Sequence, residues 1–242
     1  MSIDISVIIP TIDEALYIER TLKSVTSQTH GFKFEIIVCD GGSKDKTTEI
    51  AAKYAKVVVC PIRNTGTQLN FAVDFSRGKI LVFLDADTII PADYLQRVFR
   101  SFLNDTDLYA CGATFVYIGR KKYNVKLGKI STTITEHVLV NFAMYMWYII
   151  RNAFHFTEIP GCNFCVRRDV FLEVGGFRHS HSIPVDVALS TSIRELIRLR
   201  GKGKMRILRS TAVLTSPRHV TLRRSIKIAM DYKKTLSHVS HG

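Results

Sequence analysis

The sequence has few of the features that would divide a chain or insert it into a membrane. Its 242 residues include six prolines and one tryptophan, with no internal repeat and no low-complexity linker. No apolar run reaches the roughly twenty residues that a membrane-spanning helix requires. The N-terminus shows no basic segment, apolar stretch or small-residue cleavage site, so we expect no secretory signal and a cytoplasmic location. The length suits one large domain, or one domain with an appendage.

Cysteine is scarce as well. The five cysteines are an odd number, and four of them lie in apolar or strand-like surroundings, so we expect buried, reduced thiols. Cys162 and Cys165 form a Cys-x-x-Cys, but without a second pair or a spaced histidine pair this is a weak indication of zinc or redox chemistry.

Two common nucleotide-binding fingerprints are missing. The chain contains no Gly-x-x-x-x-Gly-Lys-Ser/Thr, and its first expected strand is not followed by Gly-x-Gly-x-x-Gly. Neither a P-loop NTPase nor a dinucleotide-dependent dehydrogenase is therefore indicated.

Acidic residues are outnumbered, 21 against 34 Lys and Arg, for a formal charge of +13. The imbalance is concentrated in residues 194–242, with 13 basic residues and two acidic ones. Such a block suits nucleic acid, anionic lipid headgroups or phosphorylated substrates, and a merely solvated basic face is the simpler alternative. Interleaved apolar residues indicate that it is folded rather than a flexible arm.

Strand-like and helix-like segments alternate along the first half. This pattern predicts an α/β fold with right-handed crossovers and a mostly parallel, doubly wound central sheet flanked by helices. Strands are expected at 5–9, 34–39, 57–60, 79–84, 108–117 and 161–166. Helices are expected at 12–27, from Ser43 through Tyr54, and at 66–76, 93–103, 169–174, 187–199 and 222–236.

Residues 138–150 are dense in aromatic and aliphatic side chains. A core helix is the simpler interpretation of this segment. An amphipathic helix at a membrane interface is the alternative, favoured by Tyr145, Trp147 and Tyr148 and by the basic residues nearby.

An apolar run, residues 80–84, ends abruptly in Asp85-Ala86-Asp87. Ligands of open α/β sheets bind at the carboxyl ends of such strands. Two carboxylates there can hold a hard divalent ion and leave positions for the oxygens of a diphosphate. Alternatively, one Asp starts the turn and caps the helix beginning near Pro91, which explains one acid better than two.

Polar residues also follow the other expected strands. Some have simpler explanations, since Asp13 and Ser43 could cap helices and Gly41 and Gly42 could be turn residues. Their coincidence at one sheet edge favours a nucleotide-binding crevice. The segments are Pro10–Glu14, Asp40–Thr47 and Arg63–Asn70.

Together these segments resemble the family-2 glycosyltransferases of the GT-A (Rossmann-like) fold. The resemblance is carried by five segments and covers about the first 220 residues. They are Val7–Glu14, Asp40–Thr47, Leu84–Thr88, Gly161–Arg168 and Gly175–Phe177. It implies a GT-A domain over 1–220, with a nucleotide-sugar-binding half (1–117) and an acceptor half (118–220), followed by a basic C-terminal helix (221–242).

The resemblance also implies roles for individual residues. Asp85 would lie near the ribose and the metal, and Asp87 would coordinate a divalent Mn²⁺ or Mg²⁺ cofactor. The base of the donor would meet Asp40 and the loop after the first strand. The full expected set for a UDP- or GDP-linked sugar is Pro10, Thr11, Asp13, Glu14, Asp40, Arg63, Asn64, Gln68, Asp85, Ala86 and Arg218.

Most inverting members of that family place the catalytic base in a Glu-Asp pair. Here the matching residues are Val185 and Asp186, so one carboxylate remains. One base is enough for a single displacement at the anomeric carbon, and Asp186 is the expected catalytic residue. As an alternative, Asp186 caps the helix expected from Val187 onward.

A last candidate pair lies near the C-terminus. The stretch Leu214–His219 resembles the Thr-Ser-x-Arg-Arg stretch of some family members. Arg218 would neutralise the diphosphate, and His219 would be a third metal ligand. An ordinary surface histidine is the alternative for His219.

The sequence therefore predicts a metal-dependent, inverting glycosyltransferase. The basic C-terminal region and residues 138–150 suggest a lipid-linked (polyprenyl phosphate) acceptor and a peripheral position on the inner face of the cell membrane. A sugar nucleotidyltransferase is the enzymatic alternative, although it would need a glycine-rich basic loop after the first strand. A nucleic-acid-binding protein would explain the charge, but the acidic strand ends would repel phosphates.

Overall fold

The structure of the chain is a computed structural model. It describes residues 3–29, 31–118, 122–127, 130–135, 159–178 and 184–218, with 122–127 and 130–135 described by their backbone.

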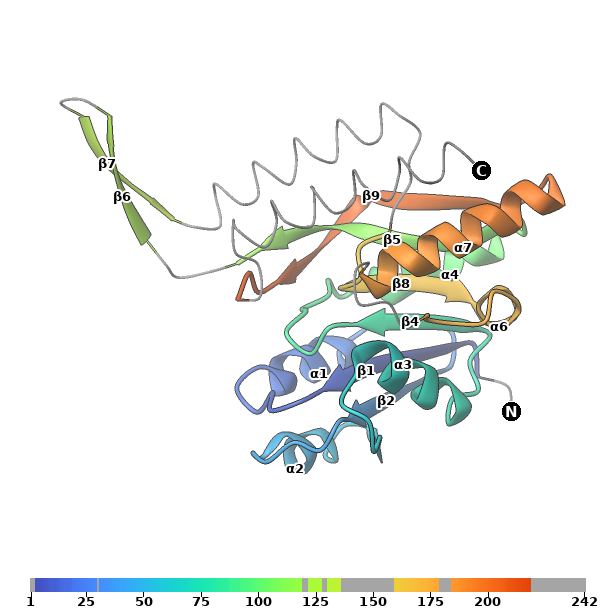
Figure 1. The fold of residues 1–242 in the computed structure, drawn as a ribbon, viewed down its shortest axis with the longest axis horizontal. Helices are drawn as coiled ribbons and strands as arrows, with labels where there is room; N and C mark the ends of the chain where they lie inside the picture. Colours follow the sequence, from blue (N-terminus) through green and yellow to red (C-terminus); the bar gives the residue numbers. More distant parts are fainter. Residues whose placement is uncertain are drawn as a thin grey trace.

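A seven-stranded mixed sheet forms the centre of the molecule, with the order β3-β2-β1-β4-β8-β5-β9 (Figure 1). The pairs β1/β2, β2/β3, β1/β4 and β5/β9 are parallel, and β8 runs antiparallel to both β4 and β5. The strands are β1 (Ile5–Thr11), β2 (Phe34–Asp40), β3 (Lys56–Val59), β4 (Ile80–Leu84), β5 (Leu108–Tyr117), β8 (Asn163–Arg167) and β9 (Lys204–Thr215).

Two hydrophobic clusters cover the two faces of the sheet. On β1 the alternation of a strand sends Ile5, Val7 and Ile9 into one cluster and Ile8 into the other. The first cluster includes residues of α1 (Ile18–Thr26), α2 (Thr47–Ala51) and α4 (Tyr94–Leu103). The second includes residues of α3 (Thr65–Asp74), α6 (Arg168–Glu173) and α7 (Val185–Arg200). Burial on both faces explains why the central strands are almost continuously apolar.

The predicted α/β architecture with a largely parallel sheet is confirmed, but several elements differ from the prediction. The helix expected over 12–27 begins only at Ile18, because Asp13 adopts a left-handed φ of 55° that a helix cannot contain. The acidic pair does not cap α4, which begins at Tyr94 after Asp93. Two strands that were not predicted, β6 (Lys122–Leu127) and β7 (Ile130–Thr135), pair antiparallel and are drawn beyond the end of β5 in Figure 1.

Strand β9 was not predicted at all. It pairs with β5 along its length, with a register shift between Ala113 and Thr114, and such an irregularity blurs the alternation by which a strand is recognised. Its end is fastened to the loop after β4, since Ile89 N donates to Leu214 O (2.7 Å) and Leu214 N donates to Ile89 O (2.9 Å). This bridge brings residues 214–218 next to the acidic pair.

Two sequence predictions concern segments outside the described residues. These are the aromatic segment 138–150 and the basic helix within 221–242. Within the described ranges, no helix is both long enough and apolar enough to cross a membrane.

All five cysteines are buried and free, as predicted. Burial raises the pKa of the Cys39 thiol to about 12, and it also raises the pKa of Cys111 and Cys162. Because the thiolate is the reactive form, we expect Ellman's reagent at pH 8 to label the native protein very slowly. The same protein in urea should release five equivalents at once. Rapid labelling of the folded protein would contradict this burial.

Candidate active site

The candidate site lies where the ends of β1, β2 and β4 meet the start of α7 and the end of β9. β1 ends at Thr11, β2 at Asp40, and β4 at Leu84, directly before Asp85. Parallel neighbours deliver these ends to one edge of the sheet, as the sequence predicted.

Asp40 organises the loop after β2. Its carboxylate is buried and accepts hydrogen bonds from Thr11 Oγ1 (3.0 Å), the Gly42 amide (2.9 Å), and the amide and hydroxyl of Ser43. Four donors use most of the lone pairs of a carboxylate. Asp40 therefore shapes the crevice, and its predicted contact with the donor base stays a prediction.

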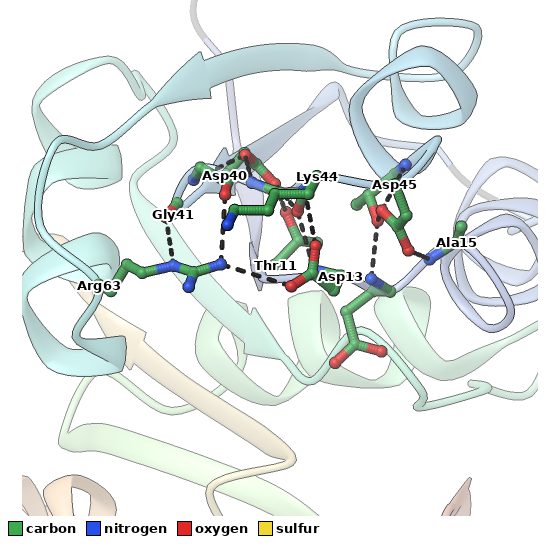
Figure 2. A network of polar contacts seen from close by, with 12 residues as sticks. Thr11, Asp13, Ala15, Asp40, Gly41, Lys44, Asp45 and Arg63 are labelled. Carbon is green, nitrogen blue, oxygen red and sulfur yellow. Dashed lines mark hydrogen bonds and ion pairs between the residues drawn. The ribbon is translucent and has the colours of Figure 1, made fainter.

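Asp13 and Arg63 join this loop to the one after β1, as Figure 2 shows. Asp13 N donates to Ser43 Oγ (2.8 Å), and Asp13 Oδ1 accepts from the Lys44 amide (2.7 Å). Arg63 donates to Gly41 O (3.1 Å) and Gly42 O (3.2 Å) and lies 3.4 Å from Asp13 Oδ2. These contacts hold Asp13, the one non-glycine residue with positive φ among those described, in its left-handed conformation.

Two further predicted donor ligands have structural contacts. Asn64 caps α3, with its Oδ1 accepting from Thr67 N (3.0 Å). Gln68 is buried, and its Nε2 donates to Thr11 O (3.1 Å) and Cys39 O (3.0 Å), which ties β1 to β2. Both residues stabilise the backbone at this edge of the sheet, and their direct contact with a donor stays a prediction.

Pro10 and Ala86 lie next to the site, in β1 and in the loop after β4. Pro10 lies in β1 opposite Cys39 of β2, one residue before the strand end. Ala86 is buried, and its carbonyl accepts from Thr21 Oγ1 of α1 (2.7 Å). That bond fixes the peptide between the two acids.

Asp85 and Asp87 have different surroundings. Asp87 is almost completely buried, its side chain 5% exposed, and its Oδ1 accepts from Thr215 Oγ1 (3.4 Å). Asp85 is exposed, and its amide donates to Cys162 O (3.4 Å) of the segment before β8. The turn between them is closed by Thr88 N donating to Asp85 O (3.1 Å).

Negative charge accumulates around Asp85. Its pKa is raised to about 7, chiefly by desolvation and also by the charges of Asp87, Asp186 and Glu14, while the charge of Arg218 acts in the opposite direction. Asp85 is nevertheless exposed to solvent, which weakens the desolvation. The site therefore holds an excess of negative charge that a cation would relieve.

Arg218 contacts two of these acids, Asp87 and Glu14. Its Nε donates to Asp87 Oδ2 (2.8 Å), and its NH2 donates to both oxygens of Glu14 (2.5 and 2.6 Å). The guanidinium carbon lies 4.3 Å from the centroid of the Tyr17 ring. Partial burial acts to lower the pKa of Arg218, but its bonds to Glu14 and the charge of Asp87 raise it, so the side chain stays charged.

Asp186 lies in the first turn of α7, which begins at Val185 after Pro184. It is inside the helix rather than its N-cap, so the alternative role in capping is wrong. Its Oδ2 accepts from the Gly161 amide (3.0 Å). A Cβ on Gly161 would lie 3.1 Å from Asp186 Cγ, so the glycine permits this close approach. Gly161 precedes Cys162, whose carbonyl holds Asp85, and this links the predicted base to the acidic pair.

The donor chemistry of the site suits a hard divalent ion. Asp85 and Asp87 offer carboxylate oxygens at the strand end, and the excess of negative charge favours a cation. No group of three His, Cys, Asp or Glu side chains among the described residues is close enough to hold a metal. The third predicted ligand, His219, lies outside them. At most two carboxylate ligands would thus come from the described residues, which leaves coordination positions of the ion for diphosphate oxygens.

Three contributors to the site were not predicted as site residues, namely Tyr17, Gly161 and Thr215. Tyr17 lies in a segment expected to be helical, and Thr215 ends the strand that the sequence pattern missed. Gly161 belongs to a motif used only for the resemblance. The interruption of the apolar pattern around Asp13 is the one sequence signal that would have predicted a loop, rather than a helix, at Tyr17.

A family model described as Glycosyl transferase family 2 matches residues 6–175. Hyaluronan synthase of Pasteurella multocida is 27% identical over 218 residues, which are 79% of this chain and 21% of that protein. Glycosyltransferase AglE of Haloferax volcanii is 37% identical over 101 residues, 38% of this chain and 33% of that protein. The chain spans about a fifth to a third of the length of these relatives.

Solved structures share the fold. The mannosyltransferase PcManGT from Pyrobaculum calidifontis, in complex with GDP-Man and Mn²⁺, superposes with a TM-score of 0.70 at 19% identity, covering 98% of this chain and 65% of that one. S. aureus TarS 1–349 in complex with UDP-GlcNAc gives a TM-score of 0.63 at 18% identity, covering 88% and 58%. The family match ends at Gly175, so Asp186 and Arg218 lie beyond it.

Proposed function

Because the chain belongs to glycosyl transferase family 2, we propose that it transfers a sugar from a nucleoside diphosphate sugar to an acceptor hydroxyl with inversion. The observation that supports this most is the position of Asp85 and Asp87 at the carboxyl end of β4, with Asp186 of α7 joined to them through Gly161 and Cys162. Family membership favours this function over a sugar nucleotidyltransferase and over nucleic-acid binding.

In the proposed reaction, Asp186 acts as the general base. It takes the proton of the acceptor hydroxyl while that oxygen forms a bond to the anomeric carbon, and the bond from that carbon to the diphosphate oxygen breaks. The bond from the Gly161 amide fixes the orientation of the Asp186 carboxylate. The nucleoside diphosphate leaves with the electron pair of the broken bond.

The leaving diphosphate requires positive charge. A divalent ion, Mn²⁺ or Mg²⁺, held by Asp87 and Asp85 would supply electrostatic stabilisation of the diphosphate. Arg218 is near enough to Asp87 to add its own charge. Asp13, Arg63 and the Asp40 loop form the adjoining wall, which we assign to the base and ribose of the donor.

Structures similar to this one hold UDP-GlcNAc and GDP-Man, so both UDP- and GDP-linked sugars are candidate donors. The polyprenyl phosphate acceptor remains a prediction from the sequence, and its ionised phosphate oxygen would not need the general base proposed for a hydroxyl acceptor. Contact with an anionic membrane surface and a cytoplasmic location also remain predictions from the sequence.

Calorimetry with a donor panel tests the proposed function. We expect at least one of UDP-glucose, UDP-GlcNAc and GDP-mannose to bind in the presence of Mn²⁺ or Mg²⁺ and to be hydrolysed slowly without acceptor. Binding should weaken when EDTA removes the metal. Failure of the whole panel, with folding verified by circular dichroism, would overturn the proposal.

A further inference from the structure

Arg218 is held by three side chains. It contacts the carboxylates of Glu14 and Asp87 and the ring of Tyr17. Its side chain is 24% exposed, and those of Glu14 and Asp87 are 13% and 5% exposed. Long arginine side chains lose substantial rotamer freedom when fixed in this way, so the contacts must be favourable enough to offset that loss.

The position of Arg218 conflicts with the role expected of Asp87. Asp87 Oδ2 is the oxygen that Arg218 Nε binds, and Asp87 Oδ1 faces Thr215 on the buried side. A dication on Oδ2 would stand directly beside a guanidinium charge. At a few ångströms such repulsion is substantial in a partly buried site.

We propose that Arg218 is an internal cation that pairs with the Asp87 carboxylate and is displaced from it when a divalent ion binds. This rests on the proposed function. Glu14 retains the guanidinium after it leaves Asp87, and the displacement breaks its contacts with Asp87 and with the Tyr17 ring. Arg218 follows the fastened end of β9 by three residues, which confines it to the site.

Displacement has a consequence for the order of binding. When the metal binds without nucleotide, it separates Arg218 from Asp87, and nothing replaces the contacts that Arg218 loses. A diphosphate offers the released guanidinium a new anionic partner. Metal and nucleoside diphosphate should therefore bind cooperatively, and the coupling should depend on Arg218.

In a simpler account, Arg218 does not compete with the ion for Asp87 and weakens metal binding only by long-range repulsion between the two positive charges. Tyr17 separates the two accounts, because it carries no charge. Tyr17→Leu removes the ring that supports the guanidinium and leaves every charge in place. Competition predicts tighter metal binding in Tyr17→Leu, and long-range repulsion predicts no change.

The test is calorimetric titration with MnCl₂ in the absence of nucleotide. We expect Arg218→Gln to bind Mn²⁺ about tenfold more tightly than the wild type, within the range typical of coupled sites. Tyr17→Leu should gain about threefold, in line with a modest cation–π contact. Arg97→Gln is the matched control, since it removes one arginine paired with an aspartate, Asp93, and should leave the affinity unchanged.

Repeating the titration with UDP and with GDP completes the test. The nucleotide that binds should strengthen Mn²⁺ binding more in the wild type than in Arg218→Gln. If Arg218→Gln does not fold, Tyr17→Leu alone decides. Unchanged Mn²⁺ affinity in Tyr17→Leu would overturn the proposal and leave the proposed function intact. Absence of Mn²⁺ binding in every folded variant, with or without UDP or GDP, would overturn both.

Discussion

Asp186→Asn is expected to lower the rate of sugar transfer by about 10²- to 10⁴-fold, the usual contribution of a general base. An amide oxygen can still accept the hydrogen bond from the Gly161 amide, so the side chain should keep its position at the start of α7. The amide cannot take a proton from an acceptor hydroxyl. The loss should therefore appear in kcat, with donor affinity nearly unchanged.

The measurement is steady-state transfer with the donor found by calorimetry and a panel of acceptors, together with a donor titration of the variant. Asp169→Asn is the matched control, because Asp169 is also an acid in the first turn of a helix but is exposed and bonds its neighbour, Val170 N. It should retain full activity. Full transfer by Asp186→Asn would remove Asp186 from the mechanism and require another base.

Asp87→Asn is expected to lower transfer by about 10²- to 10³-fold, comparable to removing one key electrostatic group from an active site. The side chain is nearly buried between Thr215 and Arg218, and an amide fits the same space. It loses the charge that a divalent ion requires, so the concentration of metal giving half-maximal activity should rise as well.

Activity measured against Mn²⁺ concentration checks this prediction. Asp93→Asn is a suitable control, since Asp93 lies six residues further along the same connection and pairs with Arg97 at the surface. It should show the metal dependence of the wild type. An Asp87→Asn variant with unaltered metal dependence would show that Asp87 is not a ligand.

Much of the N-terminal half could be predicted from the sequence because its signals are local. The strands ending at Thr11, Asp40 and Leu84 are nearly continuous apolar runs, and each is followed at once by polar residues. Parallel pairing then delivers those ends to one edge whatever the details of the loops. The grouping of Asp13, Asp40 and Asp85 follows from this rule.

The loop after β1 could not be predicted because its conformation depends on distant partners. Asp13 tolerates a left-handed φ because Ser43, Lys44 and Arg63 hold it there. The local sequence, with Ile18, Leu22 and Val25 at helical spacing, predicts a helix here, but the fold begins that helix only at Ile18. Tertiary contacts overrode local propensity at this point.

By itself the sequence determined the α/β class, the buried thiols, the acidic strand end and the family. Only the tertiary structure decided that β8 runs antiparallel beside β4, that Asp186 is anchored by Gly161, and that β9 places Arg218 against Asp87. The physical reason is separation along the chain. Asp87 and Arg218 are 131 residues apart, and no periodicity or spacing encodes a contact that exists only once the sheet has formed.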